Sequence, residues 1–141
     1  MKALTMNENP KPRIGVAVFV MKNGSFLMGK RKSNHGYGTW AVPGGHLEWL
    51  ETPELCGERE VTEECGLKIA NIRKLTFTNN IFGADKHYVT LWLMADYVSG
   101  EPQLLEPDKC EEWRWVTWDT MPRPLFFPEI MLLADGFTIS I

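Results

Sequence analysis

The sequence has few cysteines, no long apolar run and no excess of basic residues, and each shortage excludes a class of protein. Without an apolar run of about 18 residues, the chain is not expected to cross a membrane. Its first residues also lack the apolar core of a secretion signal. Cys56, Cys65 and Cys110 match neither a zinc site nor a CxxC motif, which is typical of a reducing compartment. We therefore expect a cytoplasmic protein without disulfides and without a membrane partner.

The charge balance also argues against a nucleic-acid partner. Lys and Arg number 15 against 18 Asp and Glu, so the formal net charge is −3, whereas nucleic-acid-binding domains are usually basic. Apolar residues make up 44% of the 141 residues, which is an ordinary globular composition for one domain with a buried core. We expect residues 1–12, which are polar and contain two prolines, to form a flexible tail, and residues 13–141 to form a single domain.

Strand patterns come first along the chain. Residues 13–21 form a β-branched apolar run typical of a strand buried on both faces, and the Asn23-Gly24 turn predicts a hairpin with a return strand over 25–31. A short strand is expected over 39–42, followed by a tight turn at Pro43-Gly44-Gly45.

A helix is predicted next, because its start and stop signals agree. Thr52 fits the N-cap, Pro53 the first helical position and Gly66 the residue that ends the helix. The side chains expected to face the sheet are Leu55, Val61, Thr62 and Cys65. Gly57 is expected on the opposite, carboxylate-bearing side.

The remaining pattern is mostly strand. Residues 67–82, 87–98 and 111–118 are predicted strands, and residues 128–134 show the apolar spacing of a second helix. This order of strands, helix, strands and helix predicts an α+β domain, with a central mixed sheet between layers of helix.

Three carboxylates crowd the predicted first helix. At about 100° per residue, Glu60 and Glu64 lie about 40° apart, and Glu63 lies about 60° to the other side of Glu60. Like charges at this spacing destabilise an isolated helix by a few tenths of a kcal/mol. The cluster is therefore either a solvated acidic face or a site for a divalent cation, since Mg²⁺ and Mn²⁺ prefer oxygen ligands. The neighbouring Arg59 and the upstream glycine pair favour the cation site.

Residues 45–67 resemble the signature of the Nudix hydrolase family, G-x5-E-x7-R-E-U-x-E-E-x-G-U, where U is aliphatic. Every defined position agrees. The matching residues are Gly45, Glu51, Arg59, Glu60, Val61, Glu63, Glu64, Gly66 and Leu67. The resemblance implies the Nudix fold, an α/β/α sandwich with a central mixed β-sheet. It also implies a Mg²⁺-dependent hydrolase of a diphosphate linked to another group, with Mn²⁺ as an alternative ion.

The same resemblance implies roles for individual residues. Glu60 and Glu64 are similar to the main metal ligands of the family, the Gly45 carbonyl to an additional ligand, and Glu63 to a position that binds metal or activates water. The general base varies within the family, so that role stays shared among the three glutamates. Arg59 is expected to orient the glutamates and Glu51 to support the preceding loop, and both are counted with the catalytic group.

Outside the signature, the stretches GKRKS, PGGHLE, HYVT, EPDKCEEW and PLFF resemble a MutT-like subgroup that includes a plant cytosolic enzyme and a human thiopurine-triphosphate hydrolase. This resemblance implies a phosphate contact at Arg31, a substrate-bordering position for Gly44 and Gly45, and a possible homodimer. His46, Thr90 and Phe126 match positions that line the base pocket. Either Glu111 or Glu112 would add a carboxylate near the metal.

We therefore expect a small-molecule enzyme that hydrolyses a nucleoside triphosphate to the monophosphate and pyrophosphate. The first candidates for the substrate are purine deoxynucleotides, including oxidised guanine forms such as 8-oxo-dGTP. Dihydroneopterin triphosphate or a prenyl diphosphate is the alternative substrate. A Nudix-fold module that senses a nucleotide without cleaving it is the rival from another class, and the intact set of glutamates disfavours it.

Overall fold

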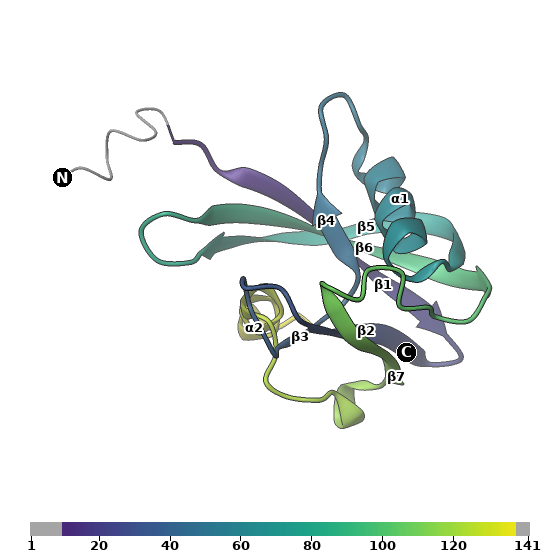
Figure 1. Cartoon of the computed structure of the whole chain (residues 1–141). Coiled ribbons are helices and arrows are strands. Elements are labelled where there is room, and N and C mark those ends of the chain that lie inside the picture. The colour runs from purple at the N-terminus through teal and green to yellow at the C-terminus, as the bar shows by residue number, and fades with distance from the viewer. Residues whose placement is uncertain (1–9, 138–141) are drawn as a thin grey trace.

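The computed structural model describes residues 10–137, and Figure 1 traces their path. Residues 10–12 are exposed and lie outside any helix or strand. The rest of the predicted tail, residues 1–9, and the last part of the predicted domain, residues 138–141, lie outside the described residues. The division into a tail and one domain therefore stays a prediction.

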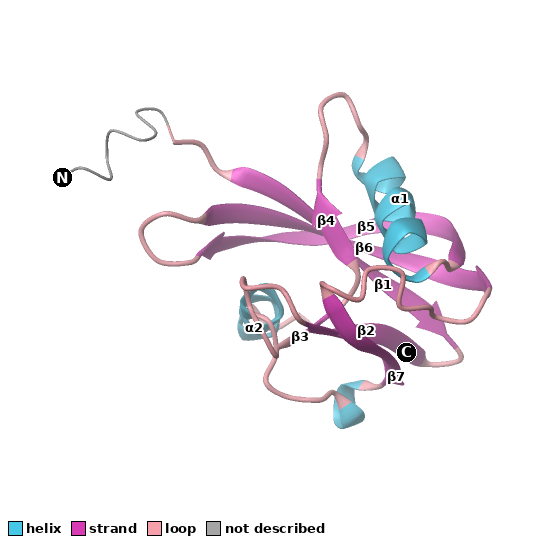
Figure 2. Cartoon of the chain, in the orientation of Figure 1, coloured by secondary structure: helices cyan, strands magenta, loops and turns pink. Residues whose placement is uncertain are grey.

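Strands are the most frequent element of the described chain, with two α-helices and one short 3-10 helix beside them (Figure 2). In chain order the elements are β1 (Arg13–Lys22), β2 (Ser25–Arg31), β3 (Trp40–Ala41), β4 (Gly44–His46), α1 (Pro53–Cys65), β5 (Lys68–Ile81), β6 (His87–Ser99), β7 (Cys110–Val116), η2 (Trp118–Thr120) and α2 (Phe127–Ala134). None of these helices has the length and apolar character that a membrane crossing requires.

Strand β1 is central because both of its faces are buried, as the apolar run predicts. Alternate side chains of a strand point to opposite faces of the sheet. Val16, Val18 and Val20 belong to the core that contains α1, whereas Ala17 and Phe19 belong to the core that contains α2. Figure 1 shows the two helices on opposite sides of the sheet. The predicted α+β sandwich with a central mixed sheet is confirmed.

The sheet is mixed because β1 pairs parallel with β6 and antiparallel with β2 and β4. Strand β5 extends it beyond β6, while β3 and β7 both pair with β2. In this register Gly15 lies opposite His46 on β4 and opposite Thr90 on β6. The sheet thus brings together two predicted pocket residues that are far apart in the sequence.

The expected turn at Gly44-Gly45 is wrong, because both glycines lie in strand β4. Gly44 is opposite Ala17, and a Cβ at position 44 would lie 2.2 Å from the Val16 carbonyl oxygen. Glycine is needed here because two backbones approach closely, and neither Gly44 nor Gly45 has a positive φ.

The predicted orientation of α1 is only partly right. Val61 and Cys65 are fully buried against the sheet, but Leu55 is 57% exposed and Thr62 is also exposed. Gly57 lies on the same side of the helix as Glu64, seven residues further on, as predicted. That side also meets the sheet, since a Cβ at Gly57 would lie 2.9 Å from Leu93 Cδ1 and 3.0 Å from a Val18 methyl carbon. The missing side chain lets α1 approach the sheet closely.

The predicted ends of α1 are confirmed. The Thr52 hydroxyl accepts a hydrogen bond from the Leu55 backbone N–H at 3.1 Å, and Pro53 is the first helical residue. Gly66 has a φ of 74°, a left-handed conformation that glycine adopts without strain. Its N–H donates to the carbonyls of Val61 and Thr62, which ends the helix. These ends fix where along the chain the helix lies.

The N-cap leads to a stability prediction. Thr52→Ala removes the acceptor for the Leu55 N–H, so we expect the free energy of unfolding to fall by about 1 kcal/mol. Chemical denaturation measures this change. Thr52→Ser keeps the hydroxyl and should retain most of the parent stability, so equal losses in the two variants would contradict the capping role.

Candidate active site

Arg59 is the centre of the charged group on α1. Its Nε and one terminal nitrogen donate to the two carboxylate oxygens of Glu51, at 2.7 and 3.0 Å. Its other terminal nitrogen donates to Glu60 and to Glu63, each at 3.1 Å. The guanidinium also donates to the His46 carbonyl at 3.2 Å. Arg59 therefore ties β4 and the following loop to the helix, and it orients two carboxylates of the cluster.

The contact with Arg59 shapes the titration of Glu51. The hydrogen bonds from the guanidinium, together with one from the Glu48 backbone N–H, lower the pKa of the Glu51 carboxyl to about 2. In turn, Glu51 raises the pKa of Arg59 above its ordinary value. The pair is therefore fully ionised at neutral pH, and Glu51 also accepts a hydrogen bond from the Glu48 N–H of the preceding loop.

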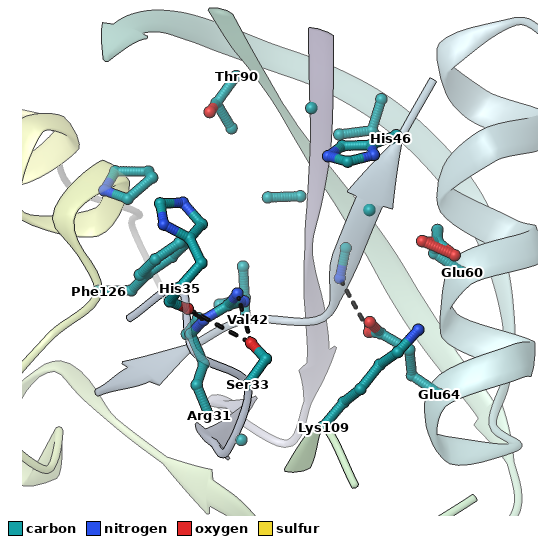
Figure 3. A pocket seen from close by; sticks show the side chains of 18 of the residues that line it. Arg31, Ser33, His35, Val42, His46, Glu60, Glu64, Thr90, Lys109 and Phe126 are labelled. Atoms are coloured by element: carbon teal, nitrogen blue, oxygen red, sulfur yellow. Dashed lines mark hydrogen bonds between the residues drawn. The ribbon is translucent and has the colours of Figure 1, made fainter. Parts of the chain in front are cut away.

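The two glycines of β4 contact the other two carboxylates. The Gly44 N–H donates to Glu64 at 3.0 Å. A Cβ at Gly45 would lie 1.4 Å from Glu60 Oε2, so the Glu60 carboxylate occupies the space that any other residue would fill. Strand β4 and helix α1 thus place Glu60, Glu64 and the Gly45 main chain side by side, and Figure 3 shows both glutamates on the side of α1 that faces the cavity.

The electrostatics of this group favour a cation. The pKa of Glu64 is raised to about 8, mainly by burial and secondly by the charge of Glu60. The hydrogen bond from Gly44 acts in the opposite direction but is weaker. Burial and the contact with Glu63 also raise the pKa of Glu60. Nearby carboxylates that resist ionisation together are stabilised in the charged form by a divalent ion.

The donor set fits Mg²⁺, although its geometry is not that of a closed metal cluster. Across residues 10–137, no three His, Cys, Asp or Glu side chains already converge as a ready-made metal site, and Arg59 and Gly44 hold the carboxylates. Magnesium commonly takes only one or two carboxylates and completes its shell with water and substrate phosphates. Glu60 and Glu64 are the carboxylates that could hold it, and the exposed Glu63 lies beside them. The Gly45 carbonyl, which the family resemblance adds as a ligand, belongs to a glycine paired with Val16 of β1.

A cavity of about 540 Å³ extends from these carboxylates to α2. This volume is within the range of small-molecule sites. All of the predicted substrate residues line it, namely Arg31, Gly44, Gly45, His46, Thr90 and Phe126, as do Glu60, Glu63 and Glu64. Figure 3 shows Glu60 and Glu64 on one side of the cavity and Phe126 on the other.

Arg31 lies in this cavity between the carboxylates and the aromatic residues. Its Nε donates to the His35 carbonyl at 3.0 Å and a terminal nitrogen donates to the Ser33 hydroxyl at 3.2 Å. The guanidinium lies 4.0 Å from the centre of the Phe126 ring, which is a cation–π contact. Burial lowers the pKa of Arg31, while the charges of Glu129 and Glu64 oppose that shift. These contacts fix a positive charge where a phosphate could bind.

The other side of the cavity is aromatic. His35 contacts the rings of Phe82 and Phe126 edge-on, with centroids 4.6 and 5.3 Å apart, and it stacks on Tyr88. His46 stacks on Tyr88 at 5.4 Å. The sequence identified Phe126 and His46 but missed His35, Phe82 and Tyr88, because they come from separate loops and strands and share no periodic pattern. Aromatic side chains of this kind are suited to bind a planar ligand.

Thr90 is held by a buried polar chain beneath the cavity. Its hydroxyl bonds to Asn80 Oδ1 at 2.9 Å, and the Thr78 hydroxyl bonds to the same oxygen at 3.0 Å. The Trp92 indole N–H donates to Thr78 in turn. Burial of this chain inside the sheet makes Thr90 a rigid part of the cavity floor.

The structure does not bring Glu111 or Glu112 to the cavity. Glu111 lies 3.6 Å from Lys30, and Glu112 lies 3.1 Å from Arg114, both as partly exposed ion pairs on β7. The carboxylate that does line the cavity is Glu106, in the preceding loop, and its charge contributes to the raised pKa of Glu60 and of Glu64. Strand alternation places neighbouring side chains on opposite faces, but it could not show that a loop residue lies closer to the site.

Glu129 is a further cavity residue that the sequence reading missed. It is 5% exposed, and one oxygen accepts a hydrogen bond from the Val42 N–H at 3.0 Å. A signal for it existed, because Glu129 is the one charged residue in the apolar stretch of α2.

Comparison with known proteins gives one family. The NUDIX domain family matches residues 11–132. The NAD-capped RNA hydrolase NudC of Pseudomonas aeruginosa is 32% identical over 114 residues, which are 79% of this chain but only 39% of NudC. The chain thus spans well under half of that relative. The ADP-ribose pyrophosphatase of Methanocaldococcus jannaschii is 30% identical over 117 residues, covering 82% of this chain and 68% of the relative.

Solved structures agree with this assignment. A MutT NUDIX hydrolase from Burkholderia pseudomallei superposes with a TM-score of 0.81 at 34% identity, covering 87% of this chain and 97% of that one. The solution structure of the E. coli ORF135 protein has a TM-score of 0.73 at 20% identity, covering 92% and 91%, and shows the shared fold alone.

The Glu51–Arg59 pair leads to a prediction about acid stability. Because the folded-state pKa of Glu51 is about 2, below its ordinary value of 4.5, its ionised form stabilises the fold at neutral pH. That contribution is lost as the pH falls from about 4.5 towards about 2. We therefore expect the difference in unfolding free energy between the parent and Glu51→Gln to shrink over this pH range, as measured by urea denaturation.

Glu58→Gln is the matched control, since it removes an exposed carboxylate from the same helix. A parent–variant difference for Glu51→Gln that stays constant down to about pH 3 would show that Arg59 does not stabilise the ionised carboxylate.

Proposed function

Because the chain belongs to the Nudix hydrolase family, we propose that it hydrolyses a nucleoside triphosphate to the nucleoside monophosphate and pyrophosphate with Mg²⁺. The observation that carries this proposal is a cavity with carboxylates at one end and aromatic rings at the other. A nucleotide has the same division, with a charged phosphate chain and a planar base. The chain would therefore bind its substrate lengthwise between α1 and α2.

The carboxylate end would bind the ion and the phosphates. Glu60, Glu64 and the Gly45 carbonyl are the proposed ligands, and Mn²⁺ is expected to substitute for Mg²⁺. Bound Mg²⁺ would neutralise phosphate charge and make a water molecule more acidic. Arg31 would contact the phosphate chain from the opposite side. Its two local hydrogen bonds hold the guanidinium in place, so little side-chain entropy is lost on binding.

The same residues would organise the reaction. Water would attack a phosphorus atom in line with the leaving pyrophosphate, and a glutamate would accept the proton. Glu60, Glu63 and Glu64 all remain candidates for this general base. Arg59 would not contact the substrate. It would hold the carboxylates of Glu60 and Glu63 in place through its hydrogen bonds to them. Arg31 would stabilise the charge that develops on the transferred phosphoryl group.

The aromatic end would bind the base. His35, Phe82 and Phe126 provide ring faces and edges, and His46 with Tyr88 adds a stacked pair. We place purine deoxynucleotides first, including oxidised guanine forms, as the resemblance to the plant and human MutT-like subgroup implies. Dihydroneopterin triphosphate and small prenyl diphosphates are the next candidates. The cytoplasmic location and the homodimer expected from the sequence stay predictions.

A substrate panel with one catalytic variant tests this proposal. We expect Mg²⁺-dependent release of pyrophosphate from at least one nucleoside triphosphate. Glu64→Gln should lower kcat/KM about 100-fold or more, since metal ligation contributes several kcal/mol to such reactions. Glu111→Gln, outside the cavity, is the matched control. ADP-ribose belongs in the panel because a pyrophosphatase named for it is a relative.

The panel also separates the rival functions. Binding of a nucleotide without turnover of any diphosphate would indicate a sensing module. Full activity of Glu64→Gln would remove Glu64 from the metal site.

Gly45 offers a test of the metal site that does not depend on turnover. In Gly45→Ala the new Cβ would displace the Glu60 carboxylate, which is the movable end of a flexible side chain. We therefore expect a folded protein with at least about 10-fold weaker Mn²⁺ binding, measured by calorimetry or electron paramagnetic resonance. Gly38→Ala is the control for a glycine substitution in open space, although its φ of 80° makes a small loss of stability expected. Unchanged Mn²⁺ affinity in Gly45→Ala would exclude Glu60 as a ligand.

A further inference from the structure

Glu129 has a hydrogen-bonding group without a partner in the cavity wall. The residue is 5% exposed, and its Oε2 accepts from the Val42 N–H. Its Oε1 is buried and has no hydrogen-bond partner among the described residues. Leaving such an atom unpaired costs about 1–3 kcal/mol, and more for a charged group. A carboxylate in this position therefore needs a ligand or a compensating role.

The surroundings of Glu129 place it at the base end of the cavity. Phe126 and Pro128, its neighbours in the chain, line the same cavity. Arg31 lies against the Phe126 ring, and the charge of Glu129 is the largest of those that oppose the lowering of the Arg31 pKa. Glu129 thus lies in the cavity wall near Arg31 and Phe126, at the end where the proposed function puts the nucleobase.

The chemistry of a carboxylate limits which base it can pair with. An ionised carboxylate only accepts hydrogen bonds. Guanine offers two adjacent donors, N1–H and the 2-amino group, whereas adenine offers an acceptor at N1 and no 2-amino group. Because Oε2 is already used by Val42, one free oxygen remains for a ligand donor.

We propose that Glu129 selects the substrate by accepting a hydrogen bond from the N1–H or the 2-amino group of a guanine-type base. This inference rests on the proposed nucleotide hydrolysis and specifies the substrate class of that site. Burial raises the pKa of Glu129 to about 8 in the absence of a ligand. A donor from the base stabilises the ionised carboxylate and lowers that pKa, so binding and ionisation would support each other.

The parent enzyme gives the first arm of the test. At a pH above about 8, where the Glu129 carboxyl is ionised, we expect kcat/KM for dGTP to exceed that for dATP by at least about 10-fold, because dATP leaves the carboxylate facing an acceptor. With dITP, which keeps N1–H but lacks the 2-amino group, an intermediate value is expected. If the parent hydrolyses dATP as efficiently as dGTP, the inference is overturned without any variant.

Two substitutions give the second arm. Glu129→Leu removes the acceptor, so the ratio of kcat/KM for dGTP over dATP should fall to within about threefold of unity. In Glu129→Gln the carbonyl can still accept from Val42 and the amide presents donors to the base, so the ratio should shift towards dATP. Asp135→Asn, at the exposed end of α2, is the matched control and should keep the parent ratio.

The ratio separates recognition from support of the fold. Loss of the contact with Val42 would lower stability and activity towards all substrates alike, which thermal unfolding detects, but it would not change the ratio. An unchanged ratio in both variants would make Glu129 a structural acceptor and overturn the inference.

Failure of the proposed function looks different from failure of this inference. A parent that turns over no triphosphate contradicts the proposed hydrolysis. The role of Glu129 is then decided by calorimetry with the products, where tighter binding of dGMP than of dAMP, lost in Glu129→Leu, supports it. Equal binding of the two monophosphates overturns it.

Discussion

The contact of one guanidinium with three carboxylates is the interaction on which the rest of the site depends. Arg59 binds Glu51, Glu60 and Glu63 together with the His46 carbonyl. It therefore links β4, the loop after it and α1. Without this contact, Glu60 and Glu63 would repel each other and the loop would lose its side-chain link to the helix. The same contact explains why a self-repelling cluster is compatible with a stable helix.

The sequence predicted the carboxylate end well because that end is local. Glu60, Glu63 and Glu64 share one face by helical geometry alone, and the cap residues Thr52 and Gly66 define where the helix lies. The strand reading was also sound for β1, since an apolar run buried on both faces has a distinctive composition. The glycine pair was misread because close approach of two backbones and a tight turn both require glycine. Only the β1–β4 pairing distinguishes the two cases.

The base end was predicted only in part, because it is assembled from distant segments. This end is formed by residues from two loops, from β6 and from α2, namely His35, Phe82, Tyr88 and Glu129. Their spacing in the sequence does not predict that they line one cavity. Gly57 shows the same limit within one helix, since helical spacing gives the side of α1 on which it lies but not its close approach to Leu93 and Val18. Sequence periodicity predicts which face of a helix or strand is buried, but it does not predict which residues of other elements pack against that face.

The hydrogen bond between Val42 and Glu129 joins residues 87 positions apart, whereas the one between Gly44 and Glu64 joins residues 20 positions apart. Closing the longer loop costs more chain entropy, and contacts distant in sequence form late in folding. On the ribosome, the segment that carries the carboxylate end is complete well before α2 has been synthesised. The two ends of the cavity therefore differ in how much chain has to be brought together, and the carboxylate end closes the shorter loop.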